Sequence, residues 1–394
     1  MTAADRPSPG GVGKARVAVA ATFFVHGLLF ASWTPHIPHV KAHLHVGDAT
    51  LGTALLGAPA GSVTAMVVAG LLLPRLGSRT LVRICLTGYC LAGPLVGLAG
   101  SVGGLFAALF VWGAFQGTLD VSMNTQAITV EHAHGRPLMN GMHAAWGLGA
   151  FAGAGLGTLG VQAGLSLTDQ LAVGGLLSLL VVGTLTLRML PDPPHERRVR
   201  EPGRSRWPRP SGLLLVLGAM AFASMLAEGA SADWSAVYLR DSLGSGVAGL
   251  GYTAFTLAMV TVRLLGNQLL ARASAHVLLP VLAGMAAVGF AAALLIGTAP
   301  AALVGFVLLG LGLGMVMPTA FSAAGRLPGR HPGVSVAIAS GLGWAGFVCG
   351  PPLIGHLAGA TSLPAALGVI PVLAAFIAVA AGRVPVLRTV RSAD

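Results

Sequence analysis

Long segments without a single charged residue constrain this chain more than any other feature of its sequence. Among them are residues 17–40, 49–74, 84–119, 273–325 and 331–382. A helix needs about 20 apolar residues to cross a bilayer. Only 9% of the residues are charged, against about 25% in a soluble domain, so the apolar surface is too large for one water-soluble core. We therefore expect a protein that faces lipid. An ordinary soluble enzyme, a disordered protein and a nucleic-acid binder are excluded.

Turn residues divide the longest of these segments into helices of bilayer-spanning length. Ser-Val-Gly-Gly at 101–104 divides one segment, and Pro-containing turns at 298–300 and 361–364 divide two others. The count of predicted transmembrane helices is then twelve. The alternating pattern of a membrane β-barrel is absent from the sequence. The predicted fold class is an all-α membrane protein with twelve transmembrane helices in two six-helix halves.

The longest polar segment lies between the sixth and seventh predicted helices and divides the chain. We expect three parts: an N-terminal six-helix bundle at 1–190, a cytoplasmic basic linker at 191–211 and a C-terminal six-helix bundle at 212–394. Of the 23 Lys and Arg residues, all but Lys41, Arg240 and Arg263 then fall in segments on the same side of the membrane. The positive-inside rule assigns that side to the cytoplasm, so both termini are predicted to be cytoplasmic.

Local motifs add a resemblance to a known family. The turn after the second predicted helix reads GLLLPRLGSR from Gly70 to Arg79, where the major facilitator superfamily has G-x-x-x-D-R-x-G-R-R. The glycines and two arginines match, whereas Pro74 and Ser78 depart from the pattern. Segments such as LDVSMN at 119–124 and HAAW at 143–146 are similar to the branch that contains fucose:proton symporters.

The resemblance covers essentially the whole chain. It implies two halves that rock around a central site and carry a small solute across a bacterial plasma (inner) membrane. It also implies a protein that works as a monomer. The sequence contains no phosphate-binding loop and no hydrolase pattern, so we expect neither an ATP-driven pump nor an enzyme. No cofactor is expected, with the proton gradient as the driving force.

Four ionisable side chains lie inside predicted helices, where a charge costs on the order of 3 kcal/mol. They are the predicted proton-coupling residues: Asp120, Glu228, Asp233 and Arg263. At 1.5 Å per residue, Asp120 and Arg263 each lie about 26 Å from the outer ends of their helices, which predicts that they pair when the inner gate is closed. The alternative is that Arg263 extends to the inner headgroups.

Glu228 is the residue predicted to carry the transported proton. The same helical rise places it in the outer half of its helix, too far from Arg263 to pair easily. A carboxyl group without a cation partner avoids a buried charge by taking up a proton. The alternative is a carboxylate that is hydrated by an open cavity.

Polar and aromatic side chains are expected to bind the solute. Gln116, Asp120 and Asn124 follow one another at a spacing of four, so they share one face of a helix. By resemblance, aromatic rings would stack on a sugar while amides bind its hydroxyl groups. The predicted substrate-binding residues are Gln116, Asn124, Asn140, His143, Trp33, Trp146, Trp234 and His26. The alternatives are a structural polar seam for Gln116, Asp120 and Asn124, an interfacial aromatic belt for Trp234, and ordinary hydrogen bonding for the histidines.

Two other patterns have open interpretations. His36, His39, His43 and His45 cluster within ten residues, but no cysteine or acid completes a ligand arrangement, so no metal site is predicted. Gly149, Gly153 and Gly157 recur at a spacing of four and predict close helix packing, either within one half or at a rocking contact between halves.

The leading functional prediction is secondary active transport of a small polar, sugar-like solute, coupled to protons. One alternative is a proton-driven exporter of a drug-like or metabolic product. Another is a membrane sensor or assembly partner that carries no solute. The predicted partners are a small-molecule solute, protons and the lipid bilayer, and no nucleic acid.

Overall fold

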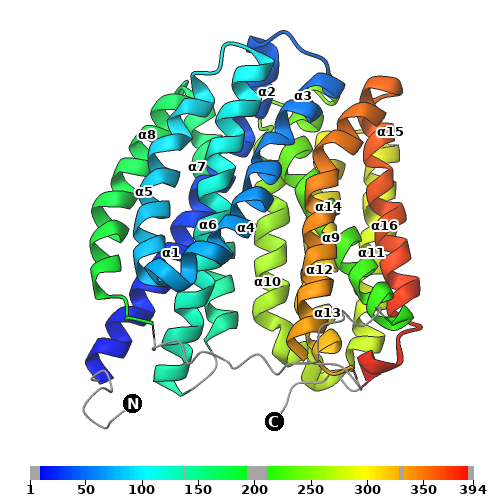
Figure 1. Ribbon diagram of the computed structural model, residues 1–394. Coiled ribbons are helices and arrows are strands. Elements are labelled where there is room, and N and C mark those ends of the chain that lie inside the picture. Colours follow the sequence, from blue (N-terminus) through cyan, green and yellow to red (C-terminus); the bar gives the residue numbers. More distant parts are fainter. Residues whose placement is uncertain (1–8, 136–137, 193–210, 328–331, 389–394) are drawn as a thin grey trace.

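The computed structural model describes residues 9–135, 138–192, 211–327 and 332–388. Within these ranges the chain is helical and contains no β-strand (Figure 1). Twelve helical segments are long and apolar enough to cross a membrane. The prediction of an all-α protein with twelve transmembrane helices is therefore confirmed. Most of the predicted linker at 191–211 lies outside the described residues.

Six spans come from residues before the linker. Their elements, in chain order, are α1 (Pro9–Trp33), η2 (Thr34–His36), α2 (Ile37–His43), α3 (Asp48–Leu55), α4 (Gly57–Leu76), α5 (Ser78–Gly97), α6 (Val102–His134), α7 (Met139–Gln162), α8 (Leu167–Ser178), η3 (Leu179–Gly183) and η4 (Thr186–Arg188). The first span combines α1, η2 and α2, the second combines α3 and α4, and the sixth combines α8, η3 and η4.

Six further spans follow the linker. Their elements are α9 (Gly212–Val237), η5 (Tyr238–Ser242), α10 (Leu250–Arg272), α11 (Ala275–Ile296), α12 (Ala299–Leu313), α13 (Val316–Gly325), α14 (Pro332–Ala360), α15 (Leu363–Leu367), α16 (Val369–Ala381) and η6 (Pro385–Arg388). The seventh span combines α9 and η5, and the tenth combines α12 and α13.

Local sequence explains where several of these helices begin and end. The side chains of Ser101, Ser166 and Ser211 accept hydrogen bonds from backbone N–H groups in the first turns of α6, α8 and α9. Such caps satisfy donors that a helix start leaves without a partner. Gly135 and Gly297 end α6 and α11 in the left-handed conformation that glycine adopts at low cost.

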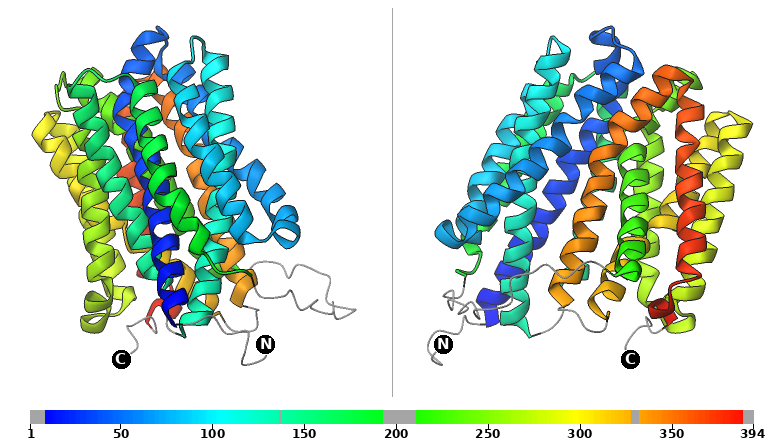
Figure 2. Two further views of the ribbon diagram at one scale, coloured as in Figure 1. Left: turned by 90° about the vertical axis from the view of Figure 1, so that its left-hand side faces the viewer. Right: turned by 45° about the vertical axis from the view of Figure 1, so that its right-hand side comes forward.

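The helices form two groups, α1–α8 and α9–α16, that converge toward one end. Figures 1 and 2 show the groups converging at the end that carries α2, α3 and α15, and spreading apart toward the end at which α1 begins. The contact at the convergent end is tight. A Cβ atom added to Gly52 of α3 would lie 2.6 Å from the carbonyl oxygen of Pro351 in α14. Glycine is therefore needed for this contact between the two groups.

The predicted glycine stripe packs inside the first group. A Cβ atom added to Gly149, Gly153 or Gly157 would collide with the backbone carbonyl of Phe24, Leu28 or Ser32, respectively, and all three carbonyls belong to α1. Helices α1 and α7 therefore lie backbone against backbone. Of the two interpretations of the stripe, the structure supports close packing within one half.

Candidate functional site

An ion pair lies near the centre of the second group of helices. The Nη2 atom of Arg263 in α10 is 3.8 Å from Oε2 of Glu228 in α9. Glu228 is buried, with 9% of its surface exposed. The Nε atom of Arg263 also donates a hydrogen bond of 3.0 Å to the carbonyl oxygen of Gly314, which follows α12. The guanidinium group thus joins three helices around one carboxylate.

This pair corrects the sequence prediction that Glu228 and Arg263 are too far apart. The seventh span extends to Ser242 and α10 starts at Leu250. Counted from these ends, both residues lie about 20 Å into their helices at 1.5 Å per residue. The prediction measured one residue from the inner end and the other from an assumed outer end, and the observed helix lengths bring them to the same depth.

Two more buried polar residues lie on the same two helices as the pair, and one of them is absent from the sequence prediction. Tyr252 of α10 is buried and interacts electrostatically with Glu228, Asp233 and Arg263. Its hydroxyl group has no hydrogen-bond partner among the described residues. A sequence signal existed, because Tyr252 and Arg263 are eleven residues apart and hence on one face of a helix, about three turns from each other.

Asp233 of α9 is also buried, and its carboxyl group is unpaired within the described ranges. Its exposed fraction is 9%, and its carboxyl group makes no hydrogen bond or ion pair with any residue in the described ranges. It lies nine residues from Ser242, closer than Glu228 to the convergent end of the molecule. The second group therefore holds two buried carboxyl groups, one paired and one unpaired.

The predicted polar face of α6 exists, but two of its three residues, Asp120 and Asn124, bind each other. The Nδ2 atom of Asn124 donates to the carbonyl oxygen of Asp120 at 2.8 Å and to its carboxyl group at 3.2 Å. Gln116 is half-buried, and its amide makes no hydrogen bond within the described part of the chain. Asp120 is not paired with Arg263 in this conformation. Their predicted pairing concerns the state with the other end closed and stays a prediction.

His26 is occupied by structural hydrogen bonds. Its Nδ1 atom accepts a bond of 2.7 Å from Trp146 Nε1, and its Nε2 atom lies 3.3 Å from the carbonyl oxygen of Gln116. These contacts assign the proton to Nε2, since a carbonyl oxygen only accepts. The ring also stacks on Tyr89 at 5.5 Å. The structure therefore favours ordinary hydrogen bonding for His26 over direct contact with a solute.

The remaining predicted binding residues lie in different surroundings. His143 is exposed, and its ring packs edge to face against Phe23, with 5.4 Å between the ring centroids. It also interacts electrostatically with Arg263 of the second group. Trp146 is half-buried and lies 6.4 Å from Phe30 between ring centroids. These two residues have surface available to a solute. The side chain of Asn140 lies outside the described residues.

Trp33 and Trp234 are buried away from this surface. Trp33 is 3% exposed, and Trp234 has no exposed surface. The Trp234 ring packs against Gly52 of α3 and Gly355 of α14, at the contact between the two groups. With no exposed surface, Trp234 does not form part of an interfacial aromatic belt in this conformation, and its predicted role in solute binding stays a prediction.

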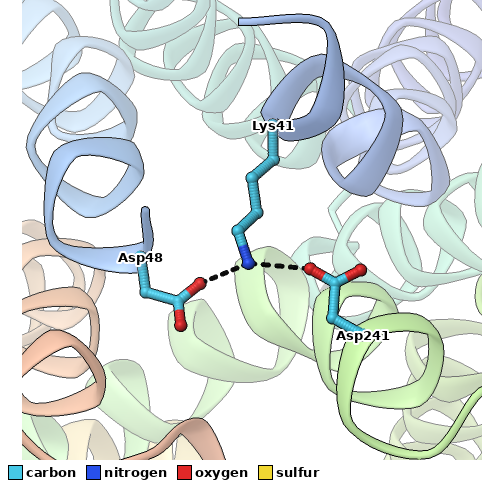
Figure 3. Close-up of polar contacts among 3 residues, drawn as sticks. All are labelled: Lys41, Asp48 and Asp241. Atoms are coloured by element: carbon cyan, nitrogen blue, oxygen red, sulfur yellow. Dashed lines mark hydrogen bonds and ion pairs between the residues drawn. The ribbon is translucent and has the colours of Figure 1, made fainter. Parts of the chain in front are cut away.

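A network of three charges joins the two groups at the convergent end (Figure 3). The Nζ atom of Lys41 in α2 is 2.6 Å from Asp48 Oδ1 in α3 and 2.7 Å from Asp241 Oδ2 in η5. Lys41 and Asp48 belong to the first group and Asp241 to the second. In the sequence Lys41 is only a topology signal, because nothing local shows which distant acid it contacts.

The histidines near this network lie in different surroundings. His36 is buried and lies 2.8 Å from Gln170 of α8, whereas His43 and His45 are exposed. The described residues contain no group of three or more His, Cys, Asp or Glu side chains suited to a metal ion.

At the opposite end, a carboxyl group docks on the turn whose motif resembles the superfamily pattern. Gly77 has a φ of 76°, and the backbone N–H and hydroxyl group of Ser78 donate to Asp192. Gln126 donates to the Ser78 hydroxyl at 2.8 Å and so joins α6 to the same turn. Pro74 stands where the family motif has its acid, and Asp192 brings a carboxylate to the turn from the end of the sixth span.

The fold and the site together define a class. The twelve spans form two groups that are in contact at one end, and buried polar side chains without hydrogen-bond partners among the described residues lie inside them. This is the architecture of a transporter. Comparison with known proteins then gives the family. A family model described as Major Facilitator Superfamily matches residues 19–338. The chain belongs to the major facilitator superfamily, and the prediction of a transporter rather than an enzyme is confirmed.

Relatives agree with this assignment. An uncharacterised MFS-type transporter of Yersinia pestis is 34% identical over 370 residues, which cover 93% of this chain and 94% of that protein. A D-xylose–proton symporter has a similar structure, with a TM-score of 0.74, 15% identity and coverage of 96% of this chain and 99% of that chain. The fucose:proton symporter of E. coli gives a TM-score of 0.61 with 17% identity, over 93% and 97% of the two chains. At these identities the two structures show a shared fold.

Proposed function

We propose that this protein is a proton-coupled carrier of a small polar, sugar-like solute. It works as a monomer in the bacterial plasma (inner) membrane, uses the proton gradient and needs no cofactor. The observation that supports this proposal is the buried Glu228–Arg263 pair. Two buried side chains without a hydrogen-bond or ion-pair partner in the described part of the chain, Asp233 and Tyr252, lie on the same helices. A buried carboxylate whose cation partner can be withdrawn takes up a proton, which is the step that proton coupling requires.

The distribution of Lys and Arg supports an orientation with both termini in the cytoplasm. The convergent end is then extracellular, and the structure is an inward-facing conformation with its outer side closed. In the proposed cycle, the solute binds between the two groups near His143, Gln116 and Trp146. Glu228 alternates between pairing with Arg263 and holding a proton. The two symporters that share the fold are named for coupling a sugar to protons, which is consistent with this choice.

Internal pH in proteoliposomes tests the proposal. Purified protein is reconstituted with a pH-sensitive dye inside, and a panel of sugars, polyols and small acids is added outside. We expect one compound class to change the internal pH, and the sign of the change gives the direction of flux. Glu228→Gln should abolish the pH signal because the amide cannot exchange a proton.

The matched control is Glu131→Gln. Glu131 lies near the far end of α6 and accepts hydrogen bonds from the backbone N–H groups of Leu138 and Met139. An amide oxygen can still accept these bonds, so we expect this variant to keep the pH signal. A full signal from Glu228→Gln with an active compound would refute the assignment of the proton to Glu228. Solute flux without any pH change would refute proton coupling itself.

A further inference from the structure

A small cleft that contains several polar side chains lies at the convergent end, apart from the central ion pair. Its volume is about 260 Å³. Residues of both helix groups line it: His39, Thr158 and Gln162 from the first group, and Arg240, Ser245, Gly246 and Gly249 from the second. Gly249 directly precedes α10, so the cleft is about 20 Å along that helix from Arg263. The cleft therefore lies on the seam between the two groups.

Arg240 gives this cleft a positive charge that no described residue neutralises. Its Nη1 atom is buried and has no hydrogen-bond partner. The ion pairs of the described chain do not include it, and the neighbouring carboxylate of Asp241 is held by Lys41. A buried donor without a partner costs about 1–3 kcal/mol, and more for a charged group. A ligand with acceptor atoms would remove that cost.

Other features near Arg240 also suit an anion, although Val161 and Ala248 make part of the lining apolar. The loop that includes Gly246 and Gly249 leads into the N-terminus of α10, where the helix dipole is positive. His39 contributes a ring close enough to Arg240 for their charges to interact. No acidic side chain lines the cleft. The volume falls below the range of about 300–1,000 Å³ typical of drug-sized ligands, so a compact anion fits best.

We propose that this cleft binds a compact oxyanion, a phosphate or carboxylate group, with Arg240 as its principal partner. The anion lies between Arg240 of one group and Thr158 and Gln162 of the other. Because both walls exist only when this end is closed, binding stabilises the closed end. A phosphate group reaches the cleft either from solution or as the headgroup of an anionic lipid.

Thermal unfolding of the full-length protein tests the proposal. The protein in phosphatidylcholine nanodiscs is titrated with sodium phosphate, and with sodium chloride at matched ionic strength. The Tm should rise to a plateau with phosphate and stay constant with chloride. Arg240→Gln should weaken the apparent Kd at least about tenfold, the loss expected for one hydrogen bond to a charged group. Arg272→Gln, at the exposed far end of α10, should leave the titration unchanged.

Lipid composition separates the two sources of phosphate. If the headgroup is the ligand, nanodiscs with phosphatidylglycerol should raise the starting Tm of the wild-type protein and suppress its response to added phosphate. If free phosphate is the ligand, the response should be the same in both lipids. Should Arg240→Gln fold poorly, His39→Gln provides a milder change that should also weaken binding. The proposal is overturned if wild-type protein shows no saturable shift in either lipid, or if Arg240→Gln retains it.

Discussion

Removing the charge that crosses the seam should open the convergent end. Asp241→Asn keeps the shape of the side chain but removes its attraction to Lys41. The side chains of Lys41 and Asp241 are 15% and 34% exposed, so solvent screens the pair and its contribution is about 1 kcal/mol. That free energy corresponds to about a fivefold shift of the equilibrium toward the open end.

Lys41→Gln should shift the equilibrium further than Asp241→Asn. Lys41 holds two carboxylates, one from each group of helices. Without the shared cation, Asp48 and Asp241 repel each other across the seam. The double variant should match Asp241→Asn alone, because it loses the same attraction across the seam but no longer places two carboxylates opposite each other.

Electron–electron distance measurements between spin labels provide the assay. Cysteines replace the exposed Thr50 of α3 and Thr361 after α14, on opposite sides of the seam, and the exposed Cys349 is changed to Ser. The wild-type pair should give mainly a short distance, and Asp241→Asn should add a longer one. Asp169→Asn is the matched control, since Asp169 is an exposed acid bonded to Ser166 within the first group. The reasoning fails if Asp241→Asn gives the same distances as wild type, or changes them no more than the control does.

Three other changes test the site and the packing. Gly153→Ala should destabilise the protein by about 1–3 kcal/mol, because the added Cβ would collide with the Leu28 carbonyl oxygen. Gly155→Ala places its Cβ in open space and should not destabilise the protein. Equal melting temperatures of the two variants would contradict this packing. Tyr252→Phe removes only a hydroxyl group without a hydrogen-bond partner among the described residues, so the Tm should stay constant or rise. Proton-coupled flux should fall if this hydroxyl group takes part in coupling, and unchanged flux would exclude it. Asp192→Asn removes a negative charge from the start of α5 and should cost about 1 kcal/mol in denaturant unfolding; no loss would show that the amide binds the turn equally well.

The number and type of helices could be predicted because the bilayer imposes them. A span needs a minimum length without charge, and the turns at 101–104 and 298–300 lie where α6 and α12 begin. The polar face of α6 was predictable for a similar reason, since a spacing of four places side chains together in any helix. These inferences use only residues that are close in the sequence.

Contacts between distant segments could not be predicted in the same way. The Glu228–Arg263 pair depends on where the seventh span and α10 end, and an error of one helical turn changes the depth by about 5 Å. Lys41 and Asp241 are 200 residues apart, and no local pattern links them. The position of Trp234 could not be predicted, because the room for its ring is provided by Gly52 and Gly355 on two other helices.

The charges of the seam determine how the opening step responds to membrane voltage. When the convergent end separates, Lys41 stays with Asp48 on one side, and Asp241 leaves together with the adjacent Arg240 on the other. Each side then keeps equal numbers of positive and negative charges, so the separation moves no net charge across the field. Moving one elementary charge through the membrane would involve about 2.3 kcal/mol per 100 mV. We therefore expect the seam charges to add no voltage dependence to the opening step, so that any dependence of the cycle on voltage comes from the charges deeper in the bilayer.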